Sequence, residues 1–260
     1  MSVAPAGIAT AFAEHRKSAA LMPYLMGGYP SIEESVAAGL AAADAGADLL
    51  ELGIPFSDPL ADGPVIHAAA TEALREGATP HGVLSVCERL AVRVPVVLMV
   101  YANIVLTAGV GAFALRAASA GASGLIVPDL PHDEAAELRA ACDAEGLALV
   151  PLVAPTTTPE RIAAIGADAR GFVYTVSLTG TTGERDELPA GLAETVERVR
   201  ASSDVPVAVG FGISTPEQAR TVAAVADGVI VGSRVVRAAG EGGASAVGSV
   251  VAELAGALQG

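Results

Sequence analysis

Acidic residues in an unusual setting mark the stretch ELGIPFSDPLADGP, residues 51–64. Glu51 lies in DLLELGI, a run typical of a buried strand, and Asp58 and Asp62 follow it closely. A carboxylate in such a run costs several kcal/mol unless it is paired or neutralised. Burial would raise the pKa of Glu51 towards neutrality, so that its carboxyl group could give and take a proton at pH 7. A hydrogen-bonded structural glutamate is the alternative.

Asp62 and Tyr174 are further candidates for chemistry. Asp62 lies in the Pro- and Gly-rich stretch FSDPLADGP; alone it would be a turn residue or a helix cap, and its place on one loop with Glu51 makes it a candidate. Tyr174 lies in GFVYTVS, where alternation places it near a strand end, although packing is the usual role of a lone tyrosine. The next stretch, SLTGTTGERDELPAG (177–191), is rich in Gly and Thr and predicts a mobile lid.

Glycines at the ends of the last two β-rich runs predict a phosphate site. They occur in GFGI (210–213) and VGSR (231–234), and GTTG (180–183) would close the ring. Backbone amides approach a ligand closely at glycine, and the N-terminus of a short following helix attracts an anion. Ordinary tight turns are the alternative for any one of these glycines.

The residue inventory excludes other kinds of chemistry. Lys17 is the only lysine and precedes the first predicted strand, so a Schiff base at a strand end is not available. The four histidines fall at scattered spacings in predicted helices or loops, which argues against a metal site. Cleavage of a carbon–carbon bond would therefore depend on general acid and base groups, with the electron sink in the substrate.

Short β-rich runs alternate about eight times with Ala-rich helical runs along the chain. Ser31, Thr158 and Thr215 each precede a first turn that contains an acidic residue, which predicts a helix N-terminus. Strands separated by helices indicate βαβ units and a parallel sheet. The predicted strands are 22–27, 48–54, 94–101, 124–129, 147–153, 171–177, 205–211 and 228–233.

Eight such units predict an α/β protein with a single closed (β/α)8 barrel, residues 1–260, and GIATAFAEHRKSAA as an extra N-terminal helix. An open doubly wound sheet is the alternative, but no GxGxxG follows the first strand. In a barrel, the ends of the strands and the loops after them carry the chemistry. Alternation places Leu49, Glu51 and Gly53 on one face, predicted to be the interior.

Composition limits the class of protein and its partners. Hydrophobic residues make up 52% and charged residues 17% of the 260, which predicts a compact fold. The net charge of −14 disfavours nucleic acid and anionic membranes as partners. No apolar run reaches the ~20 residues that cross a bilayer, and the start lacks the order of a signal peptide, so we expect a cytoplasmic protein. Cys87 and Cys142 are too isolated to indicate a disulfide framework or a zinc cluster.

Together these motifs resemble those of the tryptophan synthase alpha chain family. The similarity covers MPYLMGGYP, ELGIPFSDPLADGPVI, VLMVYAN, IVPDLP, FVYTVS with its GTTG, GFGIS and VGSR, in order over nearly the whole chain. The resemblance implies a (β/α)8 barrel lyase of tryptophan biosynthesis that cleaves indole-3-glycerol phosphate to indole and glyceraldehyde 3-phosphate by a retro-aldol reaction. It also implies an allosteric α2β2 complex, in which indole passes to a beta chain that holds pyridoxal phosphate, whereas this chain has no cofactor.

The same resemblance implies roles for individual residues. Glu51 matches the glutamate that protonates indole C3 and assists removal of the glycerol hydroxyl proton, and Asp62 matches the aspartate that holds the indole N–H. Tyr174 matches an active-site tyrosine, while Asp129 and the 56–64 loop match the beta-facing side. The matched substrate-binding positions are Tyr24 and Met99 around the indole, and Thr182, Gly183, Phe211, Gly212, Gly232 and Ser233 towards the phosphate.

Two positions depart from the family pattern, and three other functions stay open. Leu178 stands where some members have an arginine, and Tyr24 stands where phenylalanine is frequent. The alternatives are an isomerase or synthase for another sugar phosphate, an allosteric partner with weak chemistry of its own, and a free-standing indole-glycerol phosphate lyase.

Overall fold

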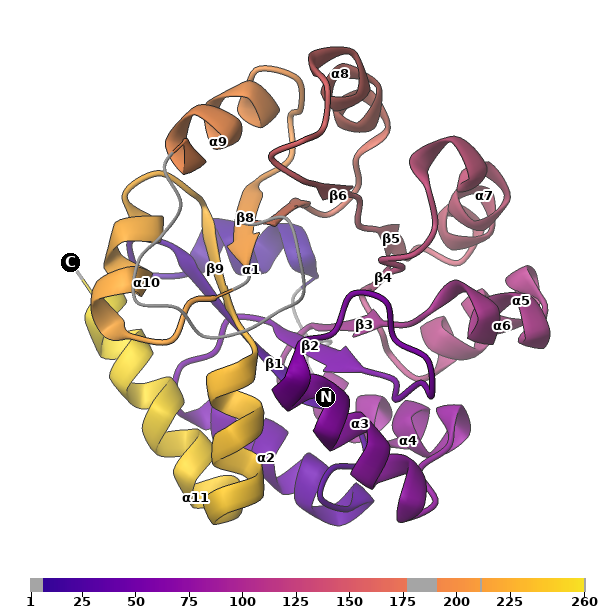
Figure 1. Ribbon diagram of the computed structural model, residues 1–260, viewed down its shortest axis with the longest axis vertical. Coiled ribbons are helices and arrows are strands. Elements are labelled where there is room, and N and C mark those ends of the chain that lie inside the picture. Colours follow the sequence, from indigo (N-terminus) through magenta and orange to yellow (C-terminus); the bar gives the residue numbers. More distant parts are fainter. Residues whose placement is uncertain (1–6, 177–190, 211, 260) are drawn as a thin grey trace, which may run out of the picture.

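The structure is a computed structural model that describes residues 7–176, 191–210 and 212–259. Its strands form one parallel sheet that curls into a barrel, and helices surround it (Figure 1). The order in the sheet is β5-β4-β3-β2-β1-β9-β8-β7-β6. The strands are β1 Ala20–Met26, β2 Leu50–Gly53, β3 Val96–Met99, β4 Gly124–Ile126, β5 Ala148–Leu149, β6 Leu152–Val153, β7 Val173–Val176, β8 Val207–Gly210 and β9 Gly228–Val231.

The barrel closes through a strand that is split in two. β5 and β6 are the halves of the predicted strand 147–153, and Pro151 lies between them. Proline has no N–H to donate, so regular pairing is interrupted there. Both neighbours are still bonded, because Val150 N donates to Leu125 O (2.9 Å) and Tyr174 N donates to Pro151 O (2.9 Å). The prediction of eight strand–helix units in a barrel is confirmed.

The helices begin where the capping residues predict. The side chains of Ser31, Thr158 and Thr215 each accept a hydrogen bond from the backbone N–H three residues further on. Within the described segments no single helix is long and apolar enough to cross a membrane; the pair α5 and α6, bent by 100°, passes that test only when taken together. The helices are α1 Ile8–Glu14, α2 Ile32–Asp44, α3 Pro64–Arg75, α4 Pro80–Ala91, α5 Ala102–Ala108, α6 Val110–Ser119, the 3-10 helix η1 His132–Glu134, α7 Ala136–Ala144, α8 Pro159–Asp168, α9 Leu192–Arg200, α10 Pro216–Ala223 and α11 Ser233–Leu258.

Alternation along the strands divides the buried side chains between two cores. On β1, Leu21 and Leu25 point outward and pack against the surrounding helices, whereas Met22 and Tyr24 point into the barrel. Both faces of these parallel strands are covered, so their residues are apolar throughout. Successive side chains along a strand therefore point in turn into the outer core and the inner core, and none of these positions needs to face solvent. The inner core is the one that surrounds the candidate site.

The extra N-terminal helix α1 closes one end of the barrel. Its Phe12 ring lies 5.7 Å from the Phe172 ring inside the barrel. Gly124 is the first residue of β4, and a Cβ atom there would lie 3.3 Å from Cδ1 of Ile8. The absence of a side chain at Gly124 therefore allows α1 to pack closely against the start of β4. Since α1 covers the amino-terminal ends of the strands, the carboxyl-terminal ends are left for the site.

Candidate active site

Glu51 is a buried carboxyl group on β2, inside the barrel. It lies in register with Tyr24 on β1 and Val97 on β3, and it is only 4% exposed. Among the residues that the structure describes, none forms a hydrogen bond with its Oε1 atom. Burial, and then the charge of Asp62, raise the pKa of Glu51 to about 8. A carboxyl group in this state holds its proton near neutral pH and can donate it to a substrate.

Asp62 lies in the loop between β2 and α3, close to Glu51. Its Oδ1 atom accepts a hydrogen bond from Tyr101 Oη at 2.9 Å. Burial raises the pKa of Asp62 above its usual range, while the bond from Tyr101 and the nearby His67 act in the opposite direction. Asp58 lies on the exposed part of the same loop, beside Ser57.

Two tyrosines project into the barrel, and a glycine on a neighbouring strand makes room for each hydroxyl group. A Cβ atom on Gly53 would lie 2.0 Å from Tyr24 Oη, and one on Gly210 would lie 2.3 Å from Tyr174 Oη. Glycine is therefore required at both strand ends by side-chain packing. We predicted that Gly210 belongs to a ligand-binding loop. Its close approach to Tyr174 is a second reason why glycine is needed at this position.

The same interior cluster holds Tyr24, Met99 and Tyr174. Burial raises the pKa of both tyrosines well above the ordinary value, and the charge of Glu51 adds to the effect at each. Tyr24 Oη has a weak partner in the Met26 sulfur, 4.0 Å away. The structure thus brings Glu51 together with these three predicted residues.

The predicted phosphate end is described only in part. Gly212 has a positive φ of 84°, a conformation that favours glycine. Gly232 is the N-cap of α11, and Ser233 is its first residue. The 26 residues of α11 comprise two helices that meet at a kink at Gly243, so the helix that begins at Ser233 is short, as we expected. Thr182, Gly183 and Phe211 lie outside the described residues, as do Leu178 and most of the predicted lid, 177–190.

Sequence reasoning missed Tyr101, which contacts Asp62 directly. Tyr101 follows β3 and is 3% exposed. Its position could have indicated a role, because Tyr101 follows Met99 by two residues at the carboxyl end of a strand, where the catalytic residues of barrels lie. Its partner lies on the preceding loop, 39 residues away in the sequence, and periodicity gives no sign of that contact.

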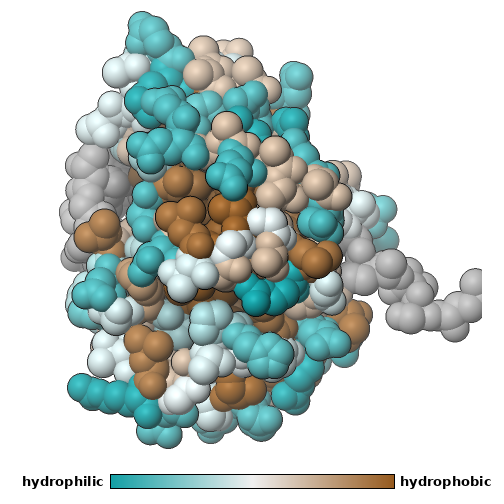
Figure 2. Space-filling view, turned by 90° about the vertical axis from the view of Figure 1, so that its right-hand side faces the viewer, coloured by the Kyte–Doolittle hydropathy of each residue, from teal (hydrophilic) through white to brown (hydrophobic). Residues whose placement is uncertain are grey.

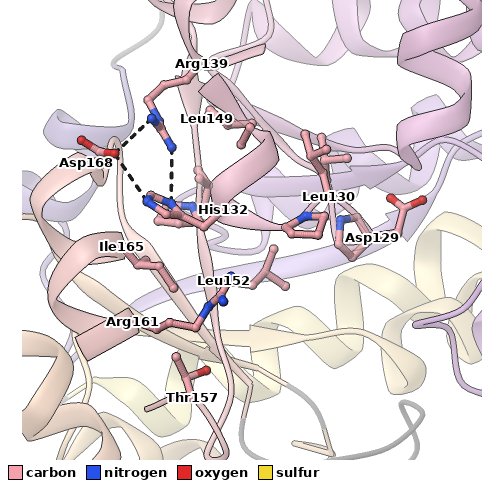
Figure 3. Close-up of a pocket in the computed structure, with 16 residues that line it drawn as sticks. Asp129, Leu130, His132, Arg139, Leu149, Leu152, Thr157, Arg161, Ile165 and Asp168 are labelled. Atoms are coloured by element: carbon pink, nitrogen blue, oxygen red, sulfur yellow. Dashed lines mark hydrogen bonds and ion pairs between the residues drawn. The ribbon is translucent and has the colours of Figure 1, made fainter. Parts of the chain in front are cut away.

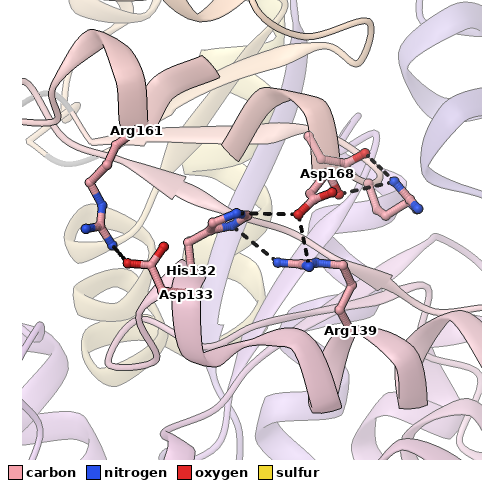
Figure 4. Close-up of polar contacts among 7 residues, drawn as sticks. His132, Asp133, Arg139, Arg161 and Asp168 are labelled. Carbon is pink, nitrogen blue, oxygen red and sulfur yellow. Dashed lines mark hydrogen bonds and ion pairs between the residues drawn. The ribbon is translucent and has the colours of Figure 1, made fainter. Parts of the chain in front are cut away.

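A second cavity, called the outer cavity below, lies between β5 and β6 and the segments η1, α7 and α8. It has a volume of about 310 Å³ and is lined by apolar residues such as Leu149, Leu152 and Ile165, with charged residues around them (Figure 3). Asp168 pairs with Arg139 (3.0 Å) and with the His132 ring (3.5 Å) at this cavity (Figure 4). Figure 2 views the side of the molecule that carries α5, α6 and α7, and shows apolar side chains gathered near its middle between hydrophilic residues. Glu51, Asp62 and Tyr174 do not line the cavity, so it is distinct from the candidate site.

Comparison with known proteins identifies close relatives along most of the chain. A family model described as "Tryptophan synthase alpha chain" matches residues 10–256. The tryptophan synthase alpha chain of Gloeobacter violaceus is 49% identical over 90% of this chain and 86% of its own length. That of Carboxydothermus hydrogenoformans is 48% identical over 88% of this chain and 87% of its own.

Solved structures agree with these sequence matches. A Mycobacterium tuberculosis tryptophan synthase chain superposes with a TM-score of 0.92 at 43% identity, covering 98% of this chain and 99% of that one. A chain from the tryptophan synthase α2β2 complex of Pyrococcus furiosus superposes with a TM-score of 0.85 at 38% identity, covering 93% of this chain and 99% of that one.

Proposed function

The chain belongs to the tryptophan synthase alpha chain family, and we propose that Glu51 and Asp62 carry out the family's reaction in this protein. That reaction is the retro-aldol cleavage of indole-3-glycerol phosphate to indole and glyceraldehyde 3-phosphate, a lyase step of tryptophan biosynthesis. The observation that carries the proposal is a buried carboxyl group whose pKa is about 8, next to the second carboxylate, Asp62.

Glu51 acts first as an acid and then as a base. Its proton goes to C3 of the indole ring, which turns the ring into a cationic indolenine. The resulting carboxylate takes the proton of the glycerol hydroxyl group next to the bond, the carbon–carbon bond breaks, and its electron pair returns to the ring. Indole and the aldehyde leave, and Glu51 is protonated again. A single group with a pKa near the working pH can therefore serve as both the acid and the base of the reaction.

Asp62 holds the indole N–H and stabilises the positive charge that develops on the indolenine. This role requires the ionised form of Asp62. The hydrogen bond from Tyr101 favours that form by lowering the pKa of Asp62 against the effect of burial. A fixed negative charge in a desolvated site stabilises a developing cation more strongly than water does.

The remaining predicted residues bind the substrate. Tyr24 and Met99 enclose the indole ring, with Tyr174 beside it. Backbone amides at glycines and the N-terminus of α11 bind the phosphate, and such local features are needed because the net charge of −14 repels an anion. The phosphate-binding residues are Gly212, Gly232 and Ser233, with Thr182, Gly183 and Phe211.

The partner is a tryptophan synthase beta chain in an α2β2 complex, as in the Pyrococcus furiosus relative. The beta chain receives the indole and holds pyridoxal phosphate, while this chain, one barrel domain over residues 1–260, uses no cofactor. Asp129 and the 56–64 loop face the partner. In support, Asp129 Oδ1 accepts a hydrogen bond from Ala102 N (2.8 Å), which ties it to the start of α5, beside that loop.

Indole release from indole-3-glycerol phosphate tests the function. Purified protein is assayed alone and with a beta chain from the same organism, and Glu51→Gln is compared with the wild type. We expect indole formation that rises strongly with the beta chain, and a kcat at least about 100-fold lower in Glu51→Gln. Binding of glycerol 3-phosphate should be unchanged, since the fold and the phosphate end are intact.

Other outcomes decide between the alternatives. Undiminished turnover by Glu51→Gln excludes Glu51 as the acid and base. A high rate without the beta chain indicates a free-standing lyase. If the wild type releases no indole in either setting, the site serves another sugar phosphate.

A further inference from the structure

The loop that carries Asp62 has little structure of its own. It connects β2 to α3 over residues 54–63 without a helix or strand. Leu60, two residues before Asp62, is 79% exposed. A carboxylate on such a loop keeps a fixed position only if other parts of the molecule hold the loop in place.

One side chain, Tyr101, contacts this loop at three points. Its ring stacks on Phe56 near the start of the loop, with 5.1 Å between centroids and 24° between planes. Its Oη atom accepts a hydrogen bond from Ala61 N (3.1 Å) and donates one to Asp62 Oδ1 (2.9 Å) near the end of the loop. Tyr101 therefore spans the loop from its first residues to its last.

Tyr101 is itself held firmly. It is 3% exposed and is the N-cap residue of α5, two residues after the end of β3. The next residue, Ala102, donates its N–H to Asp129 Oδ1 at 2.8 Å, which fixes the start of α5 to the segment after β4. The anchor of the loop thus rests on two neighbouring strands of the barrel.

The direction of the two hydrogen bonds favours one ionisation state of Asp62. A backbone N–H only donates, so the bond from Ala61 occupies the acceptor side of the Tyr101 hydroxyl. The hydroxyl proton is then directed to Asp62, which must accept it. A hydrogen bond to a carboxylate is stronger than one to a neutral carboxyl group, so the arrangement favours ionised Asp62.

We propose that Tyr101 is a positioning residue, which holds the 54–63 loop in place and directs the ionised carboxylate of Asp62 into the barrel. The catalytic part of this inference rests on the proposed function of Asp62. The loop-holding part does not, since it concerns contacts within the free protein.

Tyr101→Phe isolates the contribution of the hydroxyl group, because phenylalanine keeps the ring that stacks on Phe56. In the complex with the beta chain, we expect kcat to fall roughly 10- to 100-fold, more than KM rises, as for loss of a hydrogen bond to a charged group. Asp62 then protonates more readily, so the acid limb of the kcat profile moves to higher pH. A merely structural role would not move that limb.

Tyr29→Phe is the matched control, since Tyr29 is only partly buried and its hydroxyl group lies against Gly240 on α11. It should leave both kcat and the acid limb unchanged. Phe56→Leu serves as a second variant that removes the ring stacking and keeps both hydrogen bonds; it should lower kcat less and leave the acid limb in place.

Amide hydrogen exchange tests the loop-holding part without any assay of turnover. The Ala61 amide should exchange at least about tenfold faster in Tyr101→Phe than in the wild type, because its acceptor is gone. An unchanged Ala61 exchange rate overturns the loop-holding role. Wild-type kcat, or a lower kcat with an unmoved acid limb, overturns the action on Asp62. Absence of indole from the wild type would instead refute the proposed function, and the exchange result would still decide the role of Tyr101 in the loop.

Discussion

At the scale of single residues, the burial of Glu51 links the stability of the fold to pH. Its pKa is about 8 in the folded chain and 4.5 ordinarily, so the folded state binds this proton more tightly. The stabilisation is complete below pH 4.5 and is lost as pH rises through about 8. At about 1.36 kcal/mol per pH unit, the wild type should lose about 4 kcal/mol relative to Glu51→Gln between pH 5 and 9. Urea denaturation of both proteins at several pH values measures this difference.

Glu137→Gln provides the control for that comparison. Glu137 is exposed on α7, so its replacement should leave the pH dependence of the wild type unchanged. Parallel stability curves for the wild type and Glu51→Gln would contradict the assignment of a proton to the folded form of Glu51.

Gly53 leaves the space that the Tyr24 hydroxyl occupies. Gly53→Ala would place a Cβ atom 2.0 Å from Tyr24 Oη and 2.7 Å from its Cζ, so β2 or Tyr24 must shift. We expect a loss of about 1–3 kcal/mol in unfolding free energy, as for overpacked cores. In a Tyr24→Phe background the loss should be smaller, because the nearest atom is gone. An equal loss in both backgrounds, measured by urea denaturation, would refute this explanation.

At the scale of elements, ion pairs connect the neighbouring segments α7 and α8 across the outer cavity. Asp168, at the end of α8, pairs with Arg139 on α7 and with His132 on η1, and Arg161 on α8 pairs with Asp133 (2.9 Å; Figure 4). The cavity is lined by residues of both helices, among them Arg139 on α7 and Ile165 on α8. The ion pairs therefore hold together a part of the helical layer.

Asp168→Asn removes the charge that Arg139 and His132 share. We expect a loss of about 1 kcal/mol in unfolding free energy, the upper end for exposed pairs, since the Arg139 side chain is only 19% exposed. Asp44→Asn, which breaks a pair with Arg93 in a more exposed place, should cost less than about 0.5 kcal/mol. Turnover should be unchanged in both. An equal effect of the two substitutions, or one that persists undiminished at 1 M NaCl, would contradict this view.

The elements that could be predicted from the sequence are those with local signals. Strand periodicity and the caps at Ser31, Thr158 and Thr215 depend on residues close in the chain, and they place the barrel and its helices correctly. The break between β5 and β6 also has a local signal, which is the proline at position 151. The hydrogen bonds that join each half of this strand to the sheet depend on the neighbouring strands, β4 and β7. The contact of Tyr101 with Asp62 joins two separate loops, so only the folded chain reveals it.

At the scale of the whole molecule, the two ends of the barrel have different tasks. α1 closes the amino-terminal end, while the loops at the other end carry the candidate site. Large apolar side chains are exposed near that second end, at Leu60 on the 54–63 loop and at Leu106 on α5. The 54–63 loop and α5 are joined at Tyr101, which is the N-cap residue of α5 and a hydrogen-bond partner of Asp62. A beta chain that binds to this face would therefore contact the loop that carries Asp62.

Leu106→Asp tests this docking face against a matched control. Leu106 is 62% exposed and Val92, in the connection to β3 at the opposite end of the barrel, is 63% exposed. A carboxylate at an apolar contact must lose its hydration on binding, so Leu106→Asp should weaken activation by the beta chain at least about tenfold. Val92→Asp should not, and neither should change indole release by the isolated chain. Titration of indole release with beta chain measures this, and equal activation of both variants would place the partner elsewhere on the barrel.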